Sequence, residues 1–136
     1  MKNYFFIGLL LIPFASLYSM DDCFANKFLK LQQETWPLRR QLDTIKKYFT
    51  YKKPILSVEQ HEAFKWRHHT VCEFLDHVLT QCDHARMDLS AQKYSQIDKY
   101  INKAQAYLDQ ATKELSDYKL AVKTTLKIDF DAKAPL

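Results

Sequence analysis

The sequence predicts an all-α fold: an elongated, up-down-up antiparallel three-helix bundle, coiled-coil-like in its packing, after a cleaved signal peptide. Three observations support this prediction. The chain has 136 residues, 47% of them apolar, which suits one domain with one core. Its single glycine is Gly8, so glycine-dependent hairpin turns and phosphate-binding loops are not expected. Three later segments each repeat apolar residues at alternating steps of four and three, which is typical of bundle helices.

Residues 1–19 have the three-part pattern of a secretory signal peptide. Lys2 gives a positive start, residues 4–15 form an apolar run, and Ser19 places a small residue before the predicted cut. An uncleaved membrane anchor is the alternative, but the apolar run is shorter than the ~20 residues that a spanning helix needs. We therefore expect an exported protein, periplasmic or secreted, whose bundle occupies residues 20–128.

The first helix is predicted over residues 21–50. The apolar stripe that should face the other helices is Phe24, Phe28, Leu31, Thr35, Leu38, Leu42, Ile45 and Phe49. Pro37 lies within this helix, off the stripe. It marks either a kink or the start of a new helix that is capped by Thr35.

The second helix is predicted over residues 57–88, after a connection that contains Pro54. Ser57, with Gln60 three residues later, has the pattern of a capping box at the start of this helix. Its stripe is Phe64, His68, Val71, Leu75, Val78, Cys82, Ala85 and Leu89.

The third helix is predicted over residues 90–127, with Asp88 or Ser90 as its cap. Its stripe is Ile97, Ile101, Ala104, Leu108, Ala111, Leu115, Tyr118 and Val122. Residues 129–136 are expected to be a flexible tail. Because both connections are short, successive helices should be antiparallel neighbours.

The cysteines add a prediction about topology. Cys72 and Cys82 lie on one predicted helix about ten residues apart, or ~15 Å by helical rise, which is too far for a disulfide. A hairpin that turns near residues 50–57 would place Cys23 opposite Cys82. We therefore predict a Cys23–Cys82 disulfide, with three buried thiols as the alternative. Cys72 is then left over as a buried, inert thiol; an intermolecular disulfide and a functional thiol are the other interpretations.

All five histidines fall in the predicted second helix. Steps of four place His69, Glu73 and His77 on one helix face. The candidate metal ligands are His68, His69, Cys72, Glu73 and His77. Copper or zinc would suit them if a neighbouring helix supplied further ligands. The alternatives are a solvated helix face without a metal, and a pH response through imidazole protonation that loosens the bundle.

Charge differs between the three helical segments. Residues 21–53 have eight basic and four acidic side chains, whereas residues 57–88 have three basic and six acidic ones. Residues 90–128 have seven basic and four acidic side chains. An acidic middle helix between two basic helices favours this packing order, although each exposed pair contributes little.

Two surfaces are candidate contact sites. The first is the end of the first helix, where basic and aromatic residues alternate. Its candidate contacts for an anionic lipid head group are Lys46, Lys47, Lys52 and Lys53. The alternative is that these lysines complement the helix dipole. The candidate partner surface consists of aromatic side chains off or beside the stripes, namely Trp36, Trp66, Tyr100 and Tyr107.

No local motif places a nucleophile beside a base, so no enzymatic activity is predicted. The predicted function is that of a small exported helical bundle acting as a protein-interaction or structural module that self-associates. The alternative is a metal- or pH-responsive binding protein that uses the histidines of the second helix. The expected partner is a protein or a second copy of the chain, not a nucleic acid, with peripheral contact to an envelope lipid as a further candidate. No cofactor is expected apart from the copper or zinc of the alternative.

Overall fold

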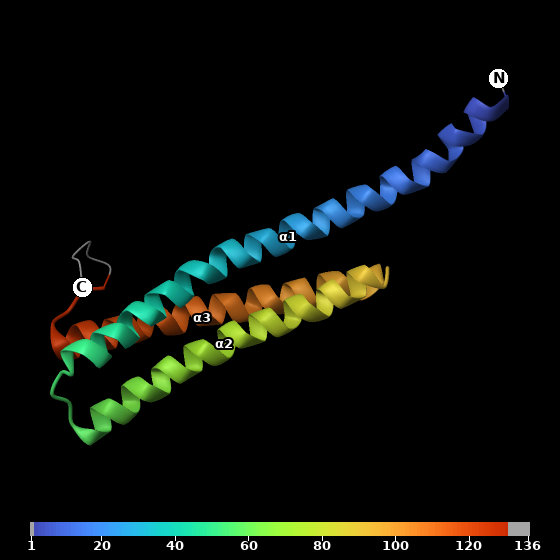
Figure 1. Ribbon diagram of the computed structural model, residues 1–136. Helices are drawn as coiled ribbons and strands as arrows, with labels where there is room; N and C mark the ends of the chain where they lie inside the picture. Colours follow the sequence, from blue (N-terminus) through green and yellow to red (C-terminus); the bar gives the residue numbers. More distant parts are fainter. Residues whose placement is uncertain (1, 131–136) are drawn as a thin grey trace.

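The computed structural model consists of long α-helices packed against one another (Figure 1). The elements are α1 (Lys2–Lys52), α2 (Val58–Ser90), a short 3-10 helix η1 (Tyr94–Gln96) and α3 (Ile97–Leu126). The structure describes the backbone of residues 2–130 and the side chains of residues 22–130. Within these residues there are three α-helices and no strand, which confirms the prediction of an all-α bundle. No helix in this part of the chain is long and apolar enough to cross a membrane.

α1 differs from its predicted range, because it begins at Lys2 and not near residue 21. No glycine or proline interrupts the chain between Phe14 and Trp36, so the backbone has no local reason to leave the helix at the predicted cut. The predicted signal peptide, residues 1–19, lies outside the residues whose side chains are described.

Pro37 does not start a new helix, so that interpretation is wrong. α1 continues through Pro37 to Lys52. The Thr35 hydroxyl donates a 2.6 Å hydrogen bond to the Leu31 carbonyl one turn earlier, as threonines inside helices do, and does not cap a following turn.

α2 begins with the predicted capping box. The Gln60 N–H donates to Ser57 Oγ at 3.1 Å, and the Ser57 N–H donates to Gln60 Oε1 at 2.9 Å. Two of the N–H groups that a helix start leaves unpaired are thereby satisfied.

The predicted start of the third helix is wrong. Asp88 and Ser90 both lie within α2, and α3 begins only at Ile97, where no side-chain cap is formed. Because α2 continues through Ser90, neither side chain is placed to cap the third helix. The turn into α3 is then made by the backbone and by η1.

α2 ends in a Schellman motif without glycine. The Lys93 N–H donates to the Asp88 carbonyl at 2.8 Å, and the Gln92 N–H donates to the Leu89 carbonyl at 3.0 Å. Gln92 has a φ of 57°, in the left-handed region that glycine occupies most easily. Lys53 and Lys127, with φ values of 43° and 60°, take the same region beside the ends of α1 and α3.

α2 and α3 pack closely along most of their length. Three ring contacts follow one another along this seam: His84–Tyr100, His77–Tyr107 and His68–Tyr118. Residue numbers fall on α2 as they rise on α3, so the two helices run in opposite directions, as Figure 1 also shows.

The core is formed by the stripes that the sequence predicts. All eight stripe residues of α3, from Ile97 to Val122, are buried. Most stripe residues of α1 and α2 are buried as well. The four that are only partly buried are Leu38, Phe49, His68 and Leu89.

α1 packs less closely against α2 and α3 than these two do against each other. Near the start of its described side chains, the Phe24 ring stacks on Tyr94 with ring centroids 6.2 Å apart. Further along, Arg39 forms a 3.2 Å ion pair with Asp76 of α2. The contacts that α1 makes with the rest of the bundle are therefore distributed along its length and are not continuous.

Residues 129 and 130, the start of the predicted tail, pack against the bundle. The Phe130 ring meets Tyr48 edge-on at 5.6 Å, and the Asp129 carboxylate accepts a 3.1 Å hydrogen bond from Lys123. The rest of the predicted tail, residues 131–136, lies outside the described residues.

Candidate functional site

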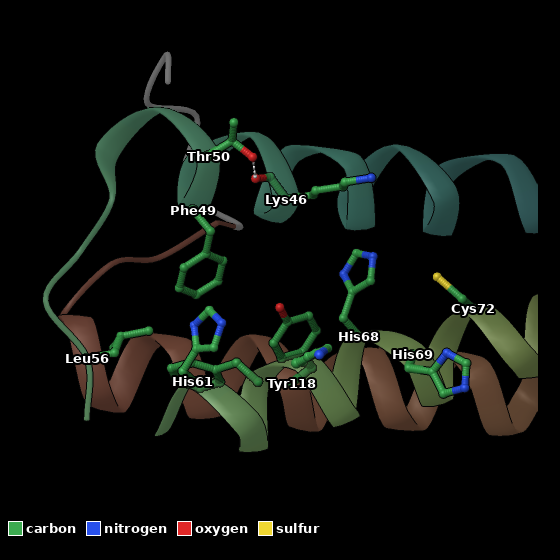
Figure 2. A pocket seen from close by; sticks show the side chains of 11 residues that line it. Lys46, Phe49, Thr50, Leu56, His61, His68, His69, Cys72 and Tyr118 are labelled. Carbon is green, nitrogen blue, oxygen red and sulfur yellow. Dashed lines mark hydrogen bonds between the residues drawn. The ribbon is translucent and has the colours of Figure 1, made fainter. Parts of the chain in front are cut away.

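Two open cavities lie between α1 and α2. The first, which we call the histidine cavity, has a volume of about 540 Å³ and lies near the connection between the two helices (Figure 2). It is lined by Lys46, Phe49, Thr50, Leu56, His61, Phe64, Lys65, His68, His69, Cys72 and Tyr118. The second, the tryptophan cavity, has a volume of about 660 Å³ and is lined by Leu29, Gln32, Gln33, Thr35, Trp36, Pro37, Arg39 and Leu79.

An aromatic wall crosses the histidine cavity from α1 to α3. The ring centroids of Phe49 and Phe64 are 5.5 Å apart, and those of Phe64 and Tyr118 are 6.2 Å apart. His68 meets Tyr118 edge-on at 6.1 Å. Figure 2 shows Phe49 and His68 directed into the space between the helices. The cavity therefore offers a continuous apolar surface with polar atoms at its edge.

Tyr118 is the most deeply buried polar group of this cavity, with 2% of the residue exposed. Its hydroxyl points toward α1 across the open cavity in Figure 2. Burial, and to a smaller extent Cys72, raises the pKa of Tyr118 to about 12. The phenol thus stays protonated and can donate a hydrogen bond to a group in the cavity.

Basic side chains surround the opening, and none of the lining residues is acidic. Lys46 of α1 and Lys65 of α2 bring a positive charge from each helix. Two acids lie close by but outside the lining: Glu73 is paired with His69 at 3.2 Å, and Asp43 lies near His68. Burial lowers the pKa of His68, and Lys46 lowers it further, so this ring favours its neutral form.

The predicted metal ligands do not converge. His69 pairs with Glu73, but His77 stacks on Tyr107 of α3 at 4.9 Å, away from them. Cys72 is half-buried, and burial raises the pKa of its thiol, which disfavours a metal-binding thiolate. Among the described residues, no group of three or more histidine, cysteine or acidic side chains is placed to hold a metal ion.

The predicted Cys23–Cys82 disulfide is not formed. All three cysteines are free thiols, with Cys23 exposed and Cys82 buried. The reason is the register of α1 on α2: Arg39 faces Asp76, and Arg86 lies over the Phe28 ring. The part of α1 opposite Cys82 is therefore about nine residues from Cys23, or roughly 14 Å along the helix, beyond the ~7 Å that a disulfide spans.

The aromatic partner surface divides into two parts. Trp36 and Trp66 are 60% and 63% exposed, but only Trp36 lines a cavity. Tyr100 and Tyr107 are instead partly buried in the α2–α3 seam, where they stack on His84 and His77. These two tyrosines close a seam within the bundle and do not form an open edge.

The predicted lipid-contact lysines also divide. Lys46, Lys47, Lys52 and Lys53 are all exposed near the end of α1. Only Lys46 lines the histidine cavity. Lys53 lies beyond the helix and takes a left-handed conformation with a φ of 43°.

Sequence reasoning missed the aromatic wall and the role of Tyr118. Phe49, Phe64 and Tyr118 were predicted as core residues, and their stripe positions gave no sign that a cavity would lie beside them. Comparison of the chain with protein-family models, curated proteins and solved structures finds no match.

Proposed function

We propose that this protein is a small exported helical bundle that acts as a self-associating protein-interaction module, not as an enzyme. The proposal includes a cleaved signal peptide over residues 1–19, a periplasmic or secreted location, and an up-down-up arrangement of the three helices. The observation that carries it is the cluster of exposed apolar side chains around the tryptophan cavity.

This cluster consists of Leu29, Trp36 and Leu79, which are 51%, 60% and 42% exposed. Leu29 and Trp36 are two turns apart on α1, and Leu79 faces them from α2. Large apolar side chains gathered around an open cavity expose area that would be stabilised by removal from water. Tryptophan is also the residue type most enriched at the centres of protein interfaces.

Charge complementarity favours a second copy of this chain as the occupant. Residues 21–53 have eight basic and four acidic side chains, whereas residues 57–88 have three basic and six acidic ones. A two-fold axis parallel to the helices would place α1 of each copy on α2 of the other. Basic helices would then face acidic helices, and the two apolar clusters would cover each other.

The test is sedimentation equilibrium of the mature protein, residues 20–136, over a range of concentrations. We expect a monomer–dimer equilibrium, and we expect Trp36→Ala to weaken the dimer by about 30-fold, as loss of a central interface tryptophan does. Trp66→Ala is the matched control, because Trp66 is equally exposed on α2 but lines neither cavity. A monomer at all concentrations, or equal weakening by both substitutions, would contradict the proposal.

A further inference from the structure

We propose that the histidine cavity binds a free amphiphilic carboxylate, such as a medium-chain fatty acid. The apolar chain would lie on the aromatic wall of Phe49, Phe64 and Tyr118. The carboxylate would accept a hydrogen bond from the Tyr118 hydroxyl and pair with Lys46. This inference does not depend on self-association, which we place at the tryptophan cavity.

The size and walls of the cavity suit a ligand of this kind. Small-molecule sites commonly have volumes of roughly 300–1,000 Å³, mostly apolar walls and a few polar groups that fix orientation. The histidine cavity has a volume of about 540 Å³, and aromatic side chains from α1, α2 and α3 form one surface within it. An extended apolar chain can cover this surface without leaving buried polar atoms unpaired.

The polar atoms of the cavity identify the head group. Only 2% of Tyr118 is exposed, and its hydroxyl points into the cavity in Figure 2. Because the hydroxyl faces the open cavity and stays protonated, it can donate a hydrogen bond to a ligand there. A carboxylate accepts hydrogen bonds strongly because it is charged.

The charges around the cavity favour an anion over a cation. Lys46 and Lys65 line it from opposite helices, and no acidic side chain is among its lining residues. Glu73, outside the lining, is already paired with His69, and Asp43 of α1 lies near His68. A cationic amphiphile would meet both Lys46 and Lys65, whose charge the nearby Asp43 offsets only in part.

The position of the site favours a free amphiphile over a membrane surface. The donor is Tyr118 of α3, which is 2% exposed and directs its hydroxyl across the cavity toward α1 (Figure 2). Lys47, Lys52 and Lys53, which could meet a lipid surface, do not line the cavity. A free amphiphile that enters the cavity would reach this donor, whereas Lys47, Lys52 and Lys53 lie outside it.

The first experiment is isothermal titration calorimetry of the full chain with decanoate, decan-1-ol and acetate. We expect decanoate to bind at least 10-fold more tightly than either of the others, because only decanoate has both the chain and the charge. Absence of decanoate binding, or equal binding of decanol, would overturn the proposal. So would association with phosphatidylglycerol vesicles by a protein that does not bind free decanoate.

The second experiment locates the ligand with paired variants. Tyr118→Phe keeps the ring and removes only the hydroxyl, and we expect it to weaken decanoate binding about 10-fold. Tyr107→Phe, on the same helix but outside the cavity, should leave binding unchanged. Unchanged affinity in Tyr118→Phe, with thermal unfolding showing that the variant is folded, would contradict the assigned contact.

A matched pair of lysine variants tests the proposed contact between Lys46 and the carboxylate. Lys46→Gln should weaken decanoate binding about 5-fold, whereas Lys47→Gln should not, since Lys47 is the adjacent lysine outside the lining. Equal effects of both substitutions would indicate general attraction and not a site. Trp36→Ala should bind decanoate normally, so failure of self-association and failure of this site can be distinguished.

Discussion

The α2–α3 seam and the α1–α2 groove are built from the same kind of apolar stripe, yet the seam is closed and the groove contains both cavities. The difference follows from side-chain size. The α3 stripe includes Ala104 and Ala111, both fully buried, and small side chains allow two helix axes to approach closely. The α1 stripe contains no alanine and has phenylalanine at three positions, so α1 is held further from its neighbours.

The edges of the two contacts differ as well. Beside the α2–α3 seam, Tyr100 and Tyr107 stack on His84 and His77 and cover the space between the helices. Beside the α1–α2 groove, long charged side chains such as Arg39 and Lys46 leave space below them. The closed seam is therefore the more tightly packed contact, and the groove contains the two surfaces at which we propose binding.

The largest expected effect is a difference in stability between alanine substitutions at two leucines of α2. Leu75 is fully buried in the core, whereas Leu79, one turn later, is 42% exposed at the groove. Leu75→Ala should lower the free energy of unfolding by about 2–5 kcal/mol, because it leaves a cavity in packed core. Leu79→Ala should lower it by less than about 1 kcal/mol. Urea unfolding at a protein concentration that keeps the chain monomeric measures both.

If Leu75→Ala and Leu79→Ala lowered the free energy of unfolding equally, the distinction between a closed seam and an open groove would be wrong. A small loss for Leu75→Ala would show that the seam can repack around an alanine, as the groove can. In either case the difference in packing would not describe the protein in solution.

The core of the fold could be predicted from the sequence because it depends on a local repeat. The steps of four and three place Ile97, Ala104 and Tyr118 on one helix face whatever the neighbours are, and all three are buried. The capping box of Ser57 and Gln60 is local in the same sense and was predicted correctly. These features depend on residues within two turns of one another.

The register between helices could not be predicted in this way. The disulfide prediction failed because it assumed that α1 and α2 mirror each other about their connection, whereas the contact of Arg39 with Asp76 shows a shifted register. The histidine cavity depends on the same register and on the distance between helices. Tyr118 has a stripe position like that of Leu115, and only the surrounding packing leaves its hydroxyl facing a cavity.

A smaller effect is expected at the connection of the closed seam. Gln92 takes a φ of 57° at the position of the Schellman motif that glycine usually fills. Gln92→Gly should raise the free energy of unfolding by about 0.5–1 kcal/mol, because the left-handed conformation is less strained without a Cβ atom. Thermal and urea unfolding of the variant measure this gain.

Gln96→Gly is the matched control for this substitution. Gln96 has a φ of −102°, so a glycine there relieves no strain and adds only freedom to the unfolded chain. We expect it to be neutral or destabilising. A gain of similar size in both variants would show that the left-handed conformation of Gln92 is not the cause.

The smallest expected effect is a pH dependence at the open groove. Burial lowers the pKa of His68 below its ordinary value of 6.5, Lys46 and His69 lower it further, and Asp43 opposes them. Cys72 also lines the cavity, and Tyr118, the aromatic neighbour from α3, is uncharged. The unfolded chain therefore binds a proton at this histidine more readily than the folded chain does.

The sign of the effect follows from this difference in proton binding. The contribution of neutral His68 to stability is fully present above about pH 6.5, and it is lost as the pH falls from there through the lowered folded pKa. Because the ring is only half-buried, solvent screening should limit the loss to a few tenths of a kcal/mol.

His68→Gln should remove this part of the pH dependence, and His61→Gln, at an exposed position of the same helix, should keep it. Urea unfolding of the three proteins at about pH 7.5 and about pH 5.5 tests the assignment. If His68→Gln lost as much stability on acidification as the parent chain, the acid sensitivity would belong to groups outside the groove.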